Sequence, residues 1–515
     1  MKKIIALVLA LLTISVLFAS CGNETPETSE SSSKAQESNT ENSESTAETT
    51  SEVSSDDEEK LLLPDIYWGT TLKMLVNKNR YYEEYEFWWD EVLDDVVVTA
   101  VVDRTRLINE KYGINIEVQY VNSLGATIAE VEKAINGGLE LDLIADGAYS
   151  IAPATLNGWF YDLREENSAV NNGEGYIQFE ASWWDQTAIR DLSIGNKLYF
   201  LTGDICVSDD EATWTMYFNK DLIDYFHLED PYMLVNNNEW TLEKMYTMAK
   251  QVTLKHGDTM SYNPEDGDRW GIVSQAYDGL MFMLGCQQTM VSKNNEDFPE
   301  LRIMDQANVN AWSAIFDILT DKENVGVADF FGAWDSGVYG QEVQIFANGN
   351  ALFMPNGVSS MSSAPLNESD VNFGIIPMPK YDENQENYSS SSTVYWLKVV
   401  AIPLSNYDNL ECTLFALEAL AYYGQTLVTP AYYEKVLKGQ KLKDENSEKM
   451  LDLIFRNRTY DMSTVYNFGT GNSIMMQFYS SLLGRKTENV ISSFYDQMES
   501  TYQSAIDKAI EAFQN

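Results

Sequence analysis

After residue 60, apolar residues recur with the period of a strand in some segments and with the period of a helix in others. The pattern predicts strands at Leu72–Val76, Ile114–Val121 and Leu141–Ala145, and helices at Asp95–Tyr112 and Ala126–Ile135. Gly113 and Gly137 follow the two helices at the positions where helices commonly end. The order strand, helix, strand, helix, strand predicts a mostly parallel sheet with helices on its faces.

Two polar side chains follow the third predicted strand directly. In open sheets of this kind, ligands bind beyond the carboxyl ends of the strands. Asp146 and Tyr149 occupy that position, on either side of Gly147. They are therefore candidate ligand-binding residues.

The middle of the chain continues to alternate, and its end is helical. Strands are predicted at Lys197–Leu201, Trp214–Phe218, Gly271–Ser274, Ala351–Met354, Phe373–Ile376 and Val394–Ile402, and helices at Lys220–Phe226, Leu242–Val252, Asn308–Leu319 and Gln341–Ala347. After Asp408 the pattern is almost wholly helical. About 455 residues after position 60 exceed the usual size of one domain, so two lobes are expected.

The first 20 residues have the pattern of a secretory signal peptide. Lys2 and Lys3 precede an apolar run, and small residues follow it before Cys21. Positions 18–21, Phe-Ala-Ser-Cys, resemble a bacterial lipobox, although leucine is commoner at the position of the phenylalanine. We expect lipidation of Cys21, with simple secretion as the alternative, because the apolar run is shorter than the ~20 residues that cross a membrane.

Residues 21–60 are predicted to form a disordered acidic tether. They are rich in Ser, Thr, Glu and Asn and contain almost no apolar residue. Such a segment cannot bury enough surface to offset the entropy of ordering. After a lipidated cysteine, it would hold a folded body away from the membrane surface.

The charge of the body excludes one class of partner. The chain has 79 acidic and 34 basic residues, and beyond residue 60 the counts are 67 and 30, a net charge near −37. Nucleic acids and anionic membrane surfaces would be repelled by such a body. We expect no nucleic-acid partner.

Few side chains suit nucleophilic or metal chemistry. The only histidines, His227 and His256, stand in neither a metal-like nor a triad-like pattern. Cys206, Cys286 and Cys412 lack the paired spacing of a zinc site or a disulfide framework, so buried thiols are expected. We expect no metal and no cofactor. Aromatic residues make up 12% of the chain, and such rings suit stacking on sugars.

Several segments of the body together have a recognisable pattern. They are Glu110–Ile116, Ala134–Gly138, Met216–Leu222, Glu239–Glu243, Phe346–Met354, Asn356–Gly357 and Phe373–Pro379. The set resembles the extracellular solute-binding lipoproteins of ABC importers, in the sugar-binding group of the periplasmic-binding-protein superfamily. The resemblance covers most of the body.

This resemblance implies an α/β fold of the class II type, with two lobes joined by crossing hinge strands and a helical C-terminal region. Lobe 1 would comprise residues 61–208 and about 403–457, and lobe 2 residues about 213–396 and 460–515. It further implies a monomeric, non-enzymatic component that closes on a small solute, an oligosaccharide by resemblance. The permease subunits of an ABC importer would receive that ligand at the extracellular face of the membrane.

The resemblance also places particular residues at the cleft between the lobes. These are Asp146, Tyr149, Asp209, Asp210, Glu211, Ser359, Tyr395 and Trp396, and from a late segment Tyr466 and Phe468. For the acidic residues 209–211, the alternative to ligand binding is a solvated loop. The turn at 358–360 lacks an aromatic residue that sugar binders often have there, which argues against a maltose-like ligand. Four tryptophans are candidates to supply the stacking ring instead, with core packing as the alternative role of each: Trp88, Trp89, Trp183 and Trp184.

Three other functions stay open at this point. An oligopeptide-binding lipoprotein has a similar length and anchor, but the Asn-Gly-Asn-Ala-Leu-Phe-Met run at 348–354 favours the sugar-binding group. A secreted glycoside hydrolase would need a carboxylate pair across the cleft, and no pair stands out. A surface sensor or adhesin would lack neighbouring permease genes.

Overall fold

The computed structural model describes residues 60–78, 86–87, 95–123, 125–331, 338–439, 445–468, 478–479, 481, 483–484 and 490–514. Two separate mixed sheets organise these residues. The lipidation candidate Cys21, the signal peptide and the tether up to residue 59 lie outside the described residues, as do Trp88 and Trp89.

The first sheet has the strand order β11-β3-β1-β2. Its strands are β1 (Thr70–Asn77), β2 (Ile114–Val121), β3 (Leu143–Gly147) and β11 (Lys398–Ala401). The first three are parallel, with Met74 opposite Leu143, and β11 runs antiparallel to β3. The strands predicted at 72–76, 114–121 and 141–145 are therefore confirmed, each within two residues.

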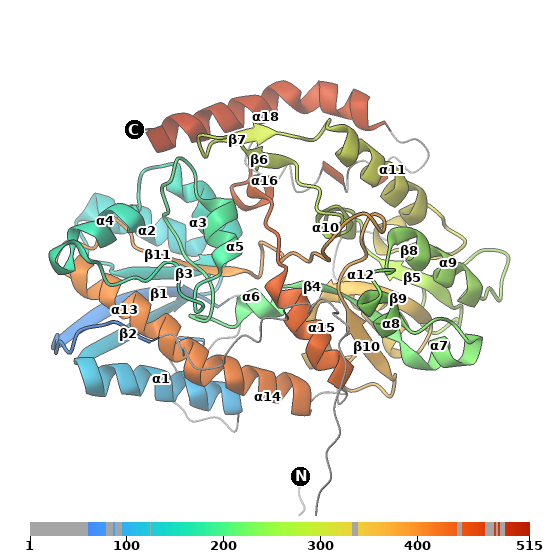
Figure 1. Cartoon of the computed structure of the whole chain (residues 1–515), viewed down its shortest axis with the longest axis horizontal. Helices are drawn as coiled ribbons and strands as arrows, with labels where there is room; N and C mark the ends of the chain where they lie inside the picture. The colour runs from blue at the N-terminus through green and yellow to red at the C-terminus, as the bar shows by residue number, and fades with distance from the viewer. Residues whose placement is uncertain are drawn as a thin grey trace, which may run out of the picture. The chain divides into compact units, whose positions relative to one another are not determined.

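Helices cover both faces of this sheet (Figure 1). They are α1 (Val96–Tyr112), α2 (Ala126–Gly137), α3 (Ala148–Thr155) and α13 (Leu410–Tyr423). On β1, Leu72 and Met74 belong to the core shared with α13, whereas Leu75 belongs to the core shared with α2 and α3. Strands that are buried on both faces read as continuous apolar runs, which is why the pattern of β1 was easy to detect.

The ends of α1 follow from two residues. The Asp95 carboxylate caps the helix by accepting the N–H groups of Val97 and Val98 at 2.9 and 3.2 Å. Gly113 ends it with φ of 66°, a left-handed conformation that favours glycine, and its N–H donates to Asn109. The chain then turns directly into β2, and α1 packs against that strand.

The second sheet has the strand order β10-β4-β9-β5-β8. Its strands are β4 (Trp214–Asn219), β5 (Trp270–Ser274), β8 (Val325–Val327), β9 (Ala351–Gly357) and β10 (Phe373–Ile376). Strands β9, β5 and β8 are parallel, and β4 is antiparallel to both of its neighbours. The surrounding helices are α7 (Lys220–Phe226), α8 (Pro231–Asn236), α9 (Leu242–Val252), α10 (Asp278–Gly285), α11 (Gln306–Leu319) and α12 (Val338–Ala347).

Among the described residues, three segments cross between the parts of the chain that contain the two sheets. The first includes α6 (Ser208–Glu211), the second covers residues 389–397, and the third covers residues 457–461. They lie side by side, since the N–H of Thr393 donates to Ala212 and the N–H of Thr459 donates to Ser390. We call these crossing segments the hinge region, after the hinge that the sequence predicts between the lobes.

Three local predictions differ from the structure. Residues 209–211, for which a solvated loop was the alternative, belong to the short helix α6, in which Asp209 and Asp210 are buried. The strand expected at Lys197–Leu201 makes only isolated bridges, because Leu201 alone reaches Val400 of β11. The strand expected at Val394–Ile402 is limited to β11, because residues 393–397 form a turn closed by hydrogen bonds from Trp396 and Leu397 to Thr393.

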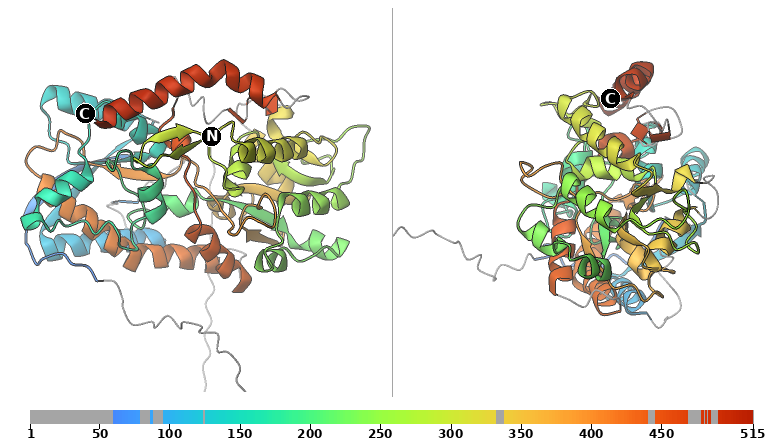
Figure 2. Two further views of the ribbon diagram at one scale, coloured as in Figure 1. Left: turned by 45° about the horizontal axis from the view of Figure 1, so that its top comes forward. Right: turned by 90° about the vertical axis from the view of Figure 1, so that its right-hand side faces the viewer.

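The C-terminal helices divide between the two sheets. Helix α14 (Thr429–Gly439) packs on α1, but α15 (Glu445–Arg456) packs on β10 of the second sheet, whereas the sequence assigned residues up to about 457 to lobe 1. The reason is its apolar face, Met450, Leu451 and Ile454, which is buried there. Helix α18 (Ile491–Gln514) lies beside β7 (Figure 2), and its Phe513 contacts Tyr199 at 5.1 Å.

The remaining elements are short. They are α4 (Leu163–Ala169), η1 (Asn171–Gly173), α5 (Gln186–Leu192), β6 (Val291–Lys293), β7 (Pro299–Leu301), η2 (Ala328–Phe330), η3 (Val358–Ser362), η4 (Gly424–Val428) and α16 (Met462–Val465). Of these, η2 and η3 matter for the site, because each directly follows a parallel strand of the second sheet.

Candidate functional site

The parallel strands of both sheets end in segments with polar or aromatic side chains. In the first sheet, β1 ends at Asn77 and β3 at Gly147. In the second sheet, β5, β8 and β9 end at Ser274, Val327 and Gly357. Because ligands bind beyond the carboxyl ends of parallel strands, these two edges define the region to inspect for a site.

Five aromatic side chains meet at these edges, and we call them the aromatic cluster. Its members are Tyr149, Trp214, Tyr277, Tyr395 and Trp396. Ring centroids lie 5.1 Å apart for Tyr149 and Tyr395, 6.3 Å for Tyr277 and Tyr395, 5.7 Å for Trp214 and Tyr277, and 5.5 Å for Trp214 and Trp396. Trp214 is buried, and the other four are half-buried. Half-buried rings of this kind can stack on the apolar face of a sugar.

The second crossing segment joins the two sides of the aromatic cluster. The N–H of Tyr149, on α3 beside the first sheet, donates to Val394 at 3.2 Å. On the other side, the hydroxyls of Tyr277 and Thr393 are 3.1 Å apart. Tyr395 lies between Tyr149 and Tyr277. A ligand on this cluster would therefore contact residues from both sheets and from the hinge.

Gly357 brings three further candidates together. A Cβ atom at this position would lie 2.8 Å from the ring of Trp396, 3.2 Å from the carbonyl oxygen of Glu211 and 3.4 Å from Oγ of Ser359. Trp396 thus packs directly on the end of β9, beside the third residue of the acidic run and the first turn of η3. The absence of a side chain at Gly357 is what permits this close approach.

Replacing Gly357 with alanine should displace Trp396. The added methyl group meets a ring and a backbone carbonyl, and overpacking of this kind costs about 1–3 kcal/mol. We expect a lower free energy of unfolding together with weaker ligand binding, measured by denaturant titration and calorimetry. Gly340→Ala is the matched control, since nothing lies within 4 Å of a Cβ atom there. Equal effects of the two changes would contradict the packing argument.

Asp146 is held in place within the first lobe's sheet edge. The carboxyl group is fully buried. It accepts one hydrogen bond from the hydroxyl of Thr127 and another, at 2.6 Å, from the N–H of Gly147. Burial raises the pKa of Asp146, and the hydrogen bonds from Thr127 and Asn77 oppose the rise. These contacts position the loop that leads into α3 and so position Tyr149.

The acidic residues Asp209 and Asp210 are paired with one arginine. Nη1 of Arg458 lies 2.9 Å from Asp209, and Nη2 lies 3.0 Å from Asp210. Its Nε lies 3.6 Å from Asp185, which also accepts the hydroxyl of Tyr460 at 2.7 Å. Burial raises the pKa of Asp210 to about 6, and that of Asp209 well above its usual value, although Arg458 opposes both shifts. These carboxylates therefore link the crossing segments at 208–211 and 457–461.

A second buried ion pair lies behind the hinge. Nζ of Lys398, the first residue of β11, pairs with the carboxylate of Glu86, and both side chains are buried. The same carboxylate accepts the N–H groups of Val207 and Ser208 at 3.0 Å each. The first crossing segment is thereby tied to the start of β11.

Tyr466 and Phe468 lie apart from the aromatic cluster. Both are buried, and their rings stack on each other with centroids 5.7 Å apart. The hydroxyl of Tyr466 donates to the carbonyl of Leu192 at 2.7 Å, and its ring contacts Phe200 and Phe513. Tyr466 thus packs between α5 and α18, and Phe468 stacks on it.

Trp214 and Tyr277 were not among the residues predicted for the site. Tyr277 lies three residues after the end of β5, so the same strand-end rule that selected Tyr149 applies to it. Trp214 begins β4, and nothing in the local pattern separates it from an ordinary core tryptophan. Its place in the cluster depends on Trp396, far away in the sequence.

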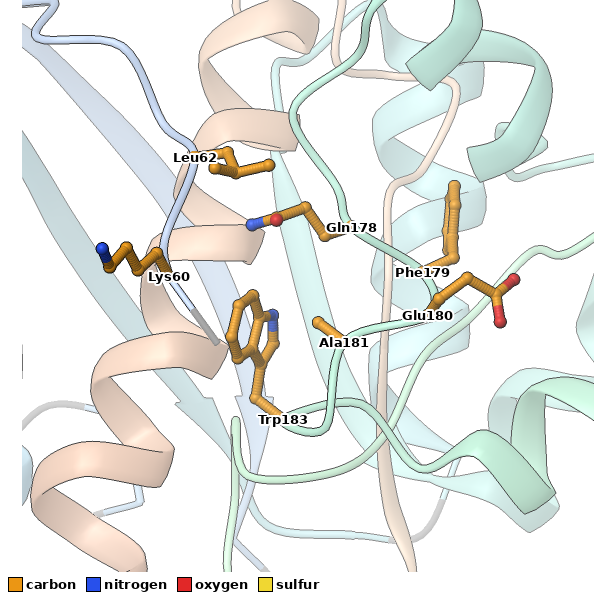
Figure 3. Close-up of a pocket in the computed structure, with 7 residues that line it drawn as sticks. All are labelled: Lys60, Leu62, Gln178, Phe179, Glu180, Ala181 and Trp183. Carbon is orange, nitrogen blue, oxygen red and sulfur yellow. The ribbon is translucent and has the colours of Figure 1, made fainter. Parts of the chain in front are cut away.

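The structure also has a surface cavity of about 450 Å³, shown in Figure 3. Its lining residues are Lys60, Leu62, Gln178, Phe179, Glu180, Ala181 and Trp183. None of them belongs to the aromatic cluster. Trp183 and Trp184 are buried, and both indole N–H groups donate to Glu418, at 3.1 and 2.9 Å. Both tryptophans therefore have the packing role that the sequence left as the alternative to ligand stacking.

The described residues contain neither a metal-like cluster nor a membrane-spanning helix. Within them, no group of His, Cys, Asp or Glu side chains has the arrangement of a metal site. Cys206, Cys286 and Cys412 are free and buried, as predicted. Among the same residues, no helix has the length and apolarity needed to span a bilayer.

Comparison with known proteins gives the family. Residues 106–417 match the family model described as bacterial extracellular solute-binding protein. The chain belongs to this family, and the resemblance of the sequence to extracellular solute-binding proteins is confirmed. A comparison with the curated proteins found no match.

Solved structures give the fold. An ABC substrate-binding protein of Listeria monocytogenes, in complex with cycloalternan, is 13% identical with a TM-score of 0.51, and the match covers 86% of this chain and 99% of that one. A solute-binding protein of Thermotoga lettingae, bound to α-D-tagatose, is 13% identical with a TM-score of 0.52, covering 85% and 99%. A sugar transporter of Rhizobium etli in an open conformation is 14% identical with a TM-score of 0.52, covering 86% and 99%. The two-lobed α/β fold expected from the sequence is confirmed.

Proposed function

We propose that this protein is the substrate-binding component of an ABC importer, and that it captures a sugar on the aromatic cluster. The observation that carries the proposal is the cluster itself. Tyr149 and Tyr277 come from opposite sheets, and Tyr395 and Trp396 come from the hinge between them. A sugar stacked there would gain contacts from both lobes and would thereby favour the closed state.

The similar structures support a sugar rather than a peptide. Three of them are a protein in complex with cycloalternan, a protein bound to tagatose and a sugar transporter. The acidic residues that the sequence assigns to the cleft include Asp209 and Asp210, and both pair with Arg458 instead of standing as a free carboxylate pair. We infer that binding occurs without catalysis, and that the permease subunits of the importer recognise the closed monomer.

A thermal-shift screen of the body from Leu61 onward tests this function. A ligand that binds only the folded state raises the melting temperature by mass action. The screen would include monosaccharides, oligosaccharides and short peptides. A shift with one sugar class, without any product after hours, supports the proposal. A response to peptides alone would favour oligopeptide binding, and cleavage of a glycan would favour a glycoside hydrolase.

We further propose that Cys21 carries a lipid anchor and that the acidic segment up to residue 60 tethers the body at the extracellular face of the membrane. Changing Cys21 to serine should move the protein from the membrane fraction to the medium. The reason is that acyl chains supply roughly 0.8 kcal/mol of membrane affinity per buried methylene, and the variant lacks their attachment point. Immunoblots of the two fractions measure this, with Ser20→Ala as the control. Retention of the Cys21→Ser variant in membranes would contradict lipidation.

A further inference from the structure

Three carboxyl groups lie together at the carboxyl edge of the second sheet. Asp278 begins α10 after β5, Asp329 lies in η2 after β8, and Glu342 lies on α12 beside the end of β9. Glu342 is bound to β9 through Nδ2 of Asn356, which donates to its Oε1 at 3.2 Å. We call these three residues the acid trio. Their position is the one at which open sheets bind ligands.

The acid trio is connected to the aromatic cluster. The indole N–H of Trp214 donates to Asp278 at 2.8 Å, and Trp214 in turn contacts Tyr277 and Trp396. Asp278 also accepts the hydroxyl of Ser274 and the N–H of Gln275 at 2.8 Å each. Trp214 therefore lies between the other rings of the aromatic cluster and Asp278 of the trio.

One oxygen atom of the trio lacks a partner. Glu342 is fully buried, and its Oε2 forms no hydrogen bond with any atom of the described residues. Asp278 is also fully buried, and Asp329 is half-buried, accepting the N–H of Ala276 at 2.6 Å. Among the described residues, no Lys, Arg or His forms an ion pair with any of the three. A buried carboxyl without a partner costs free energy, and this cost would be relieved by a donor that arrives with a ligand.

The charge of the trio points to the kind of donor. Burial raises the pKa of Asp278 to about 7, and burial together with Asp278 and Asp329 raises that of Glu342 well above its usual value. Among the described residues, the side chains that interact with the trio include Tyr262, Ser274, Tyr277, Trp214 and Asn356, all neutral. Without a cation, the trio therefore holds protons near neutral pH. An organic cation that carries N–H donors suits these carboxyl groups, because it supplies both hydrogen bonds and the compensating charge.

We propose that the acid trio receives a primary ammonium group, and that the ligand on the aromatic cluster is an amine-bearing sugar. This inference rests on the function proposed above. An ammonium offers three N–H donors, and the trio offers carboxylate oxygens on three different elements. Asp329 is half-buried and is the member of the trio in contact with solvent. On binding, the ammonium replaces protons held by the trio, and those protons pass to the buffer.

Matched sugar triplets test the inference. Each triplet consists of an amino sugar, its N-acetyl form and the parent sugar, such as glucosamine, N-acetylglucosamine and glucose, as monomers and β-linked and α-linked dimers. Calorimetry in phosphate and in Tris measures affinity and proton release together. We expect the amine to bind at least about tenfold more tightly than its partners, the size of a charge-assisted hydrogen bond, and its heat to differ between buffers.

Glu342→Gln identifies the residue responsible. The variant keeps the volume and the acceptor for Asn356 but lacks the charge, so the advantage of the amine should fall about tenfold while parent-sugar binding, the check on folding, is unchanged. Glu265→Gln, which removes an exposed carboxylate, is the matched control and should have no effect.

Each other outcome decides a separate question. Equal binding within every triplet, or tightest binding of the N-acetyl form, overturns the amine inference but leaves the sugar function intact. An unchanged preference in Glu342→Gln overturns the role of the trio. Failure of every sugar overturns both proposals, and binding of putrescine without any sugar would leave a cation site on a protein that does not bind sugars.

Discussion

Replacing Arg458 with methionine is expected to lower the free energy of unfolding by about 3–5 kcal/mol near pH 8. The guanidinium is buried and pairs with Asp209 and Asp210 at 2.9 and 3.0 Å, and removal of one partner leaves the other charges buried without compensation. Since these contacts join two crossing segments, the variant should also lose ligand affinity. Denaturant titration and calorimetry measure the two effects.

The deficit should depend on pH in a defined direction. Burial already raises the pKa of Asp210 to about 6, and removal of the cation raises it further. A carboxyl whose pKa is higher in the folded than in the unfolded state contributes stability at low pH, and that contribution is lost as the pH rises through the folded value. The variant should therefore be closest to the parent protein near pH 4 and furthest from it above about pH 6.

Arg302→Met is the matched control. Arg302 also contacts two acids, Glu300 and Asp305, at 3.0 and 3.5 Å, but its side chain is 41% exposed. Exposed ion pairs contribute about 0–1 kcal/mol, so this variant should show a small effect without the same pH dependence. A similar loss in both variants would show that burial of Arg458 has no special consequence.

Replacing Trp396 with alanine is expected to weaken sugar binding by more than about 1 kcal/mol, or at least about fivefold to tenfold in dissociation constant. A half-buried aromatic ring at a cleft supplies contact area and stacking, and such anchors dominate binding energies. Trp396 also supports Trp214, whose centroid is 5.5 Å away. Isothermal calorimetry with the sugar found by the thermal-shift screen gives the value.

Two variants make this result specific. Trp396→Phe should retain part of the affinity, because a smaller ring can still stack. Tyr225→Ala removes an aromatic residue that is 74% exposed on α7 and should leave binding unchanged. An unchanged dissociation constant for Trp396→Ala would remove this residue from the ligand site.

Local sequence determined most of the elements. Helix α1 could be predicted because Asp95 and Gly113 cap a run with helical spacing, and β1 could be predicted because both of its faces are buried. The strand-end rule selected Asp146 and Tyr149 for the same reason, since it depends only on where a strand stops. The family pattern then supplied Tyr395 and Trp396. All of these signals are contiguous in the chain.

The tertiary structure decided which of these residues act together. Arg458 neutralises Asp209 and Asp210 from a distance of about 250 positions, so a run that reads as an acidic surface turn is a buried hinge contact. Pairing of the strands of the second sheet is what brings Trp214, Tyr277 and the acid trio together. Pairing between distant segments depends on the register of the whole sheet, and the local pattern of polar and apolar residues does not specify it.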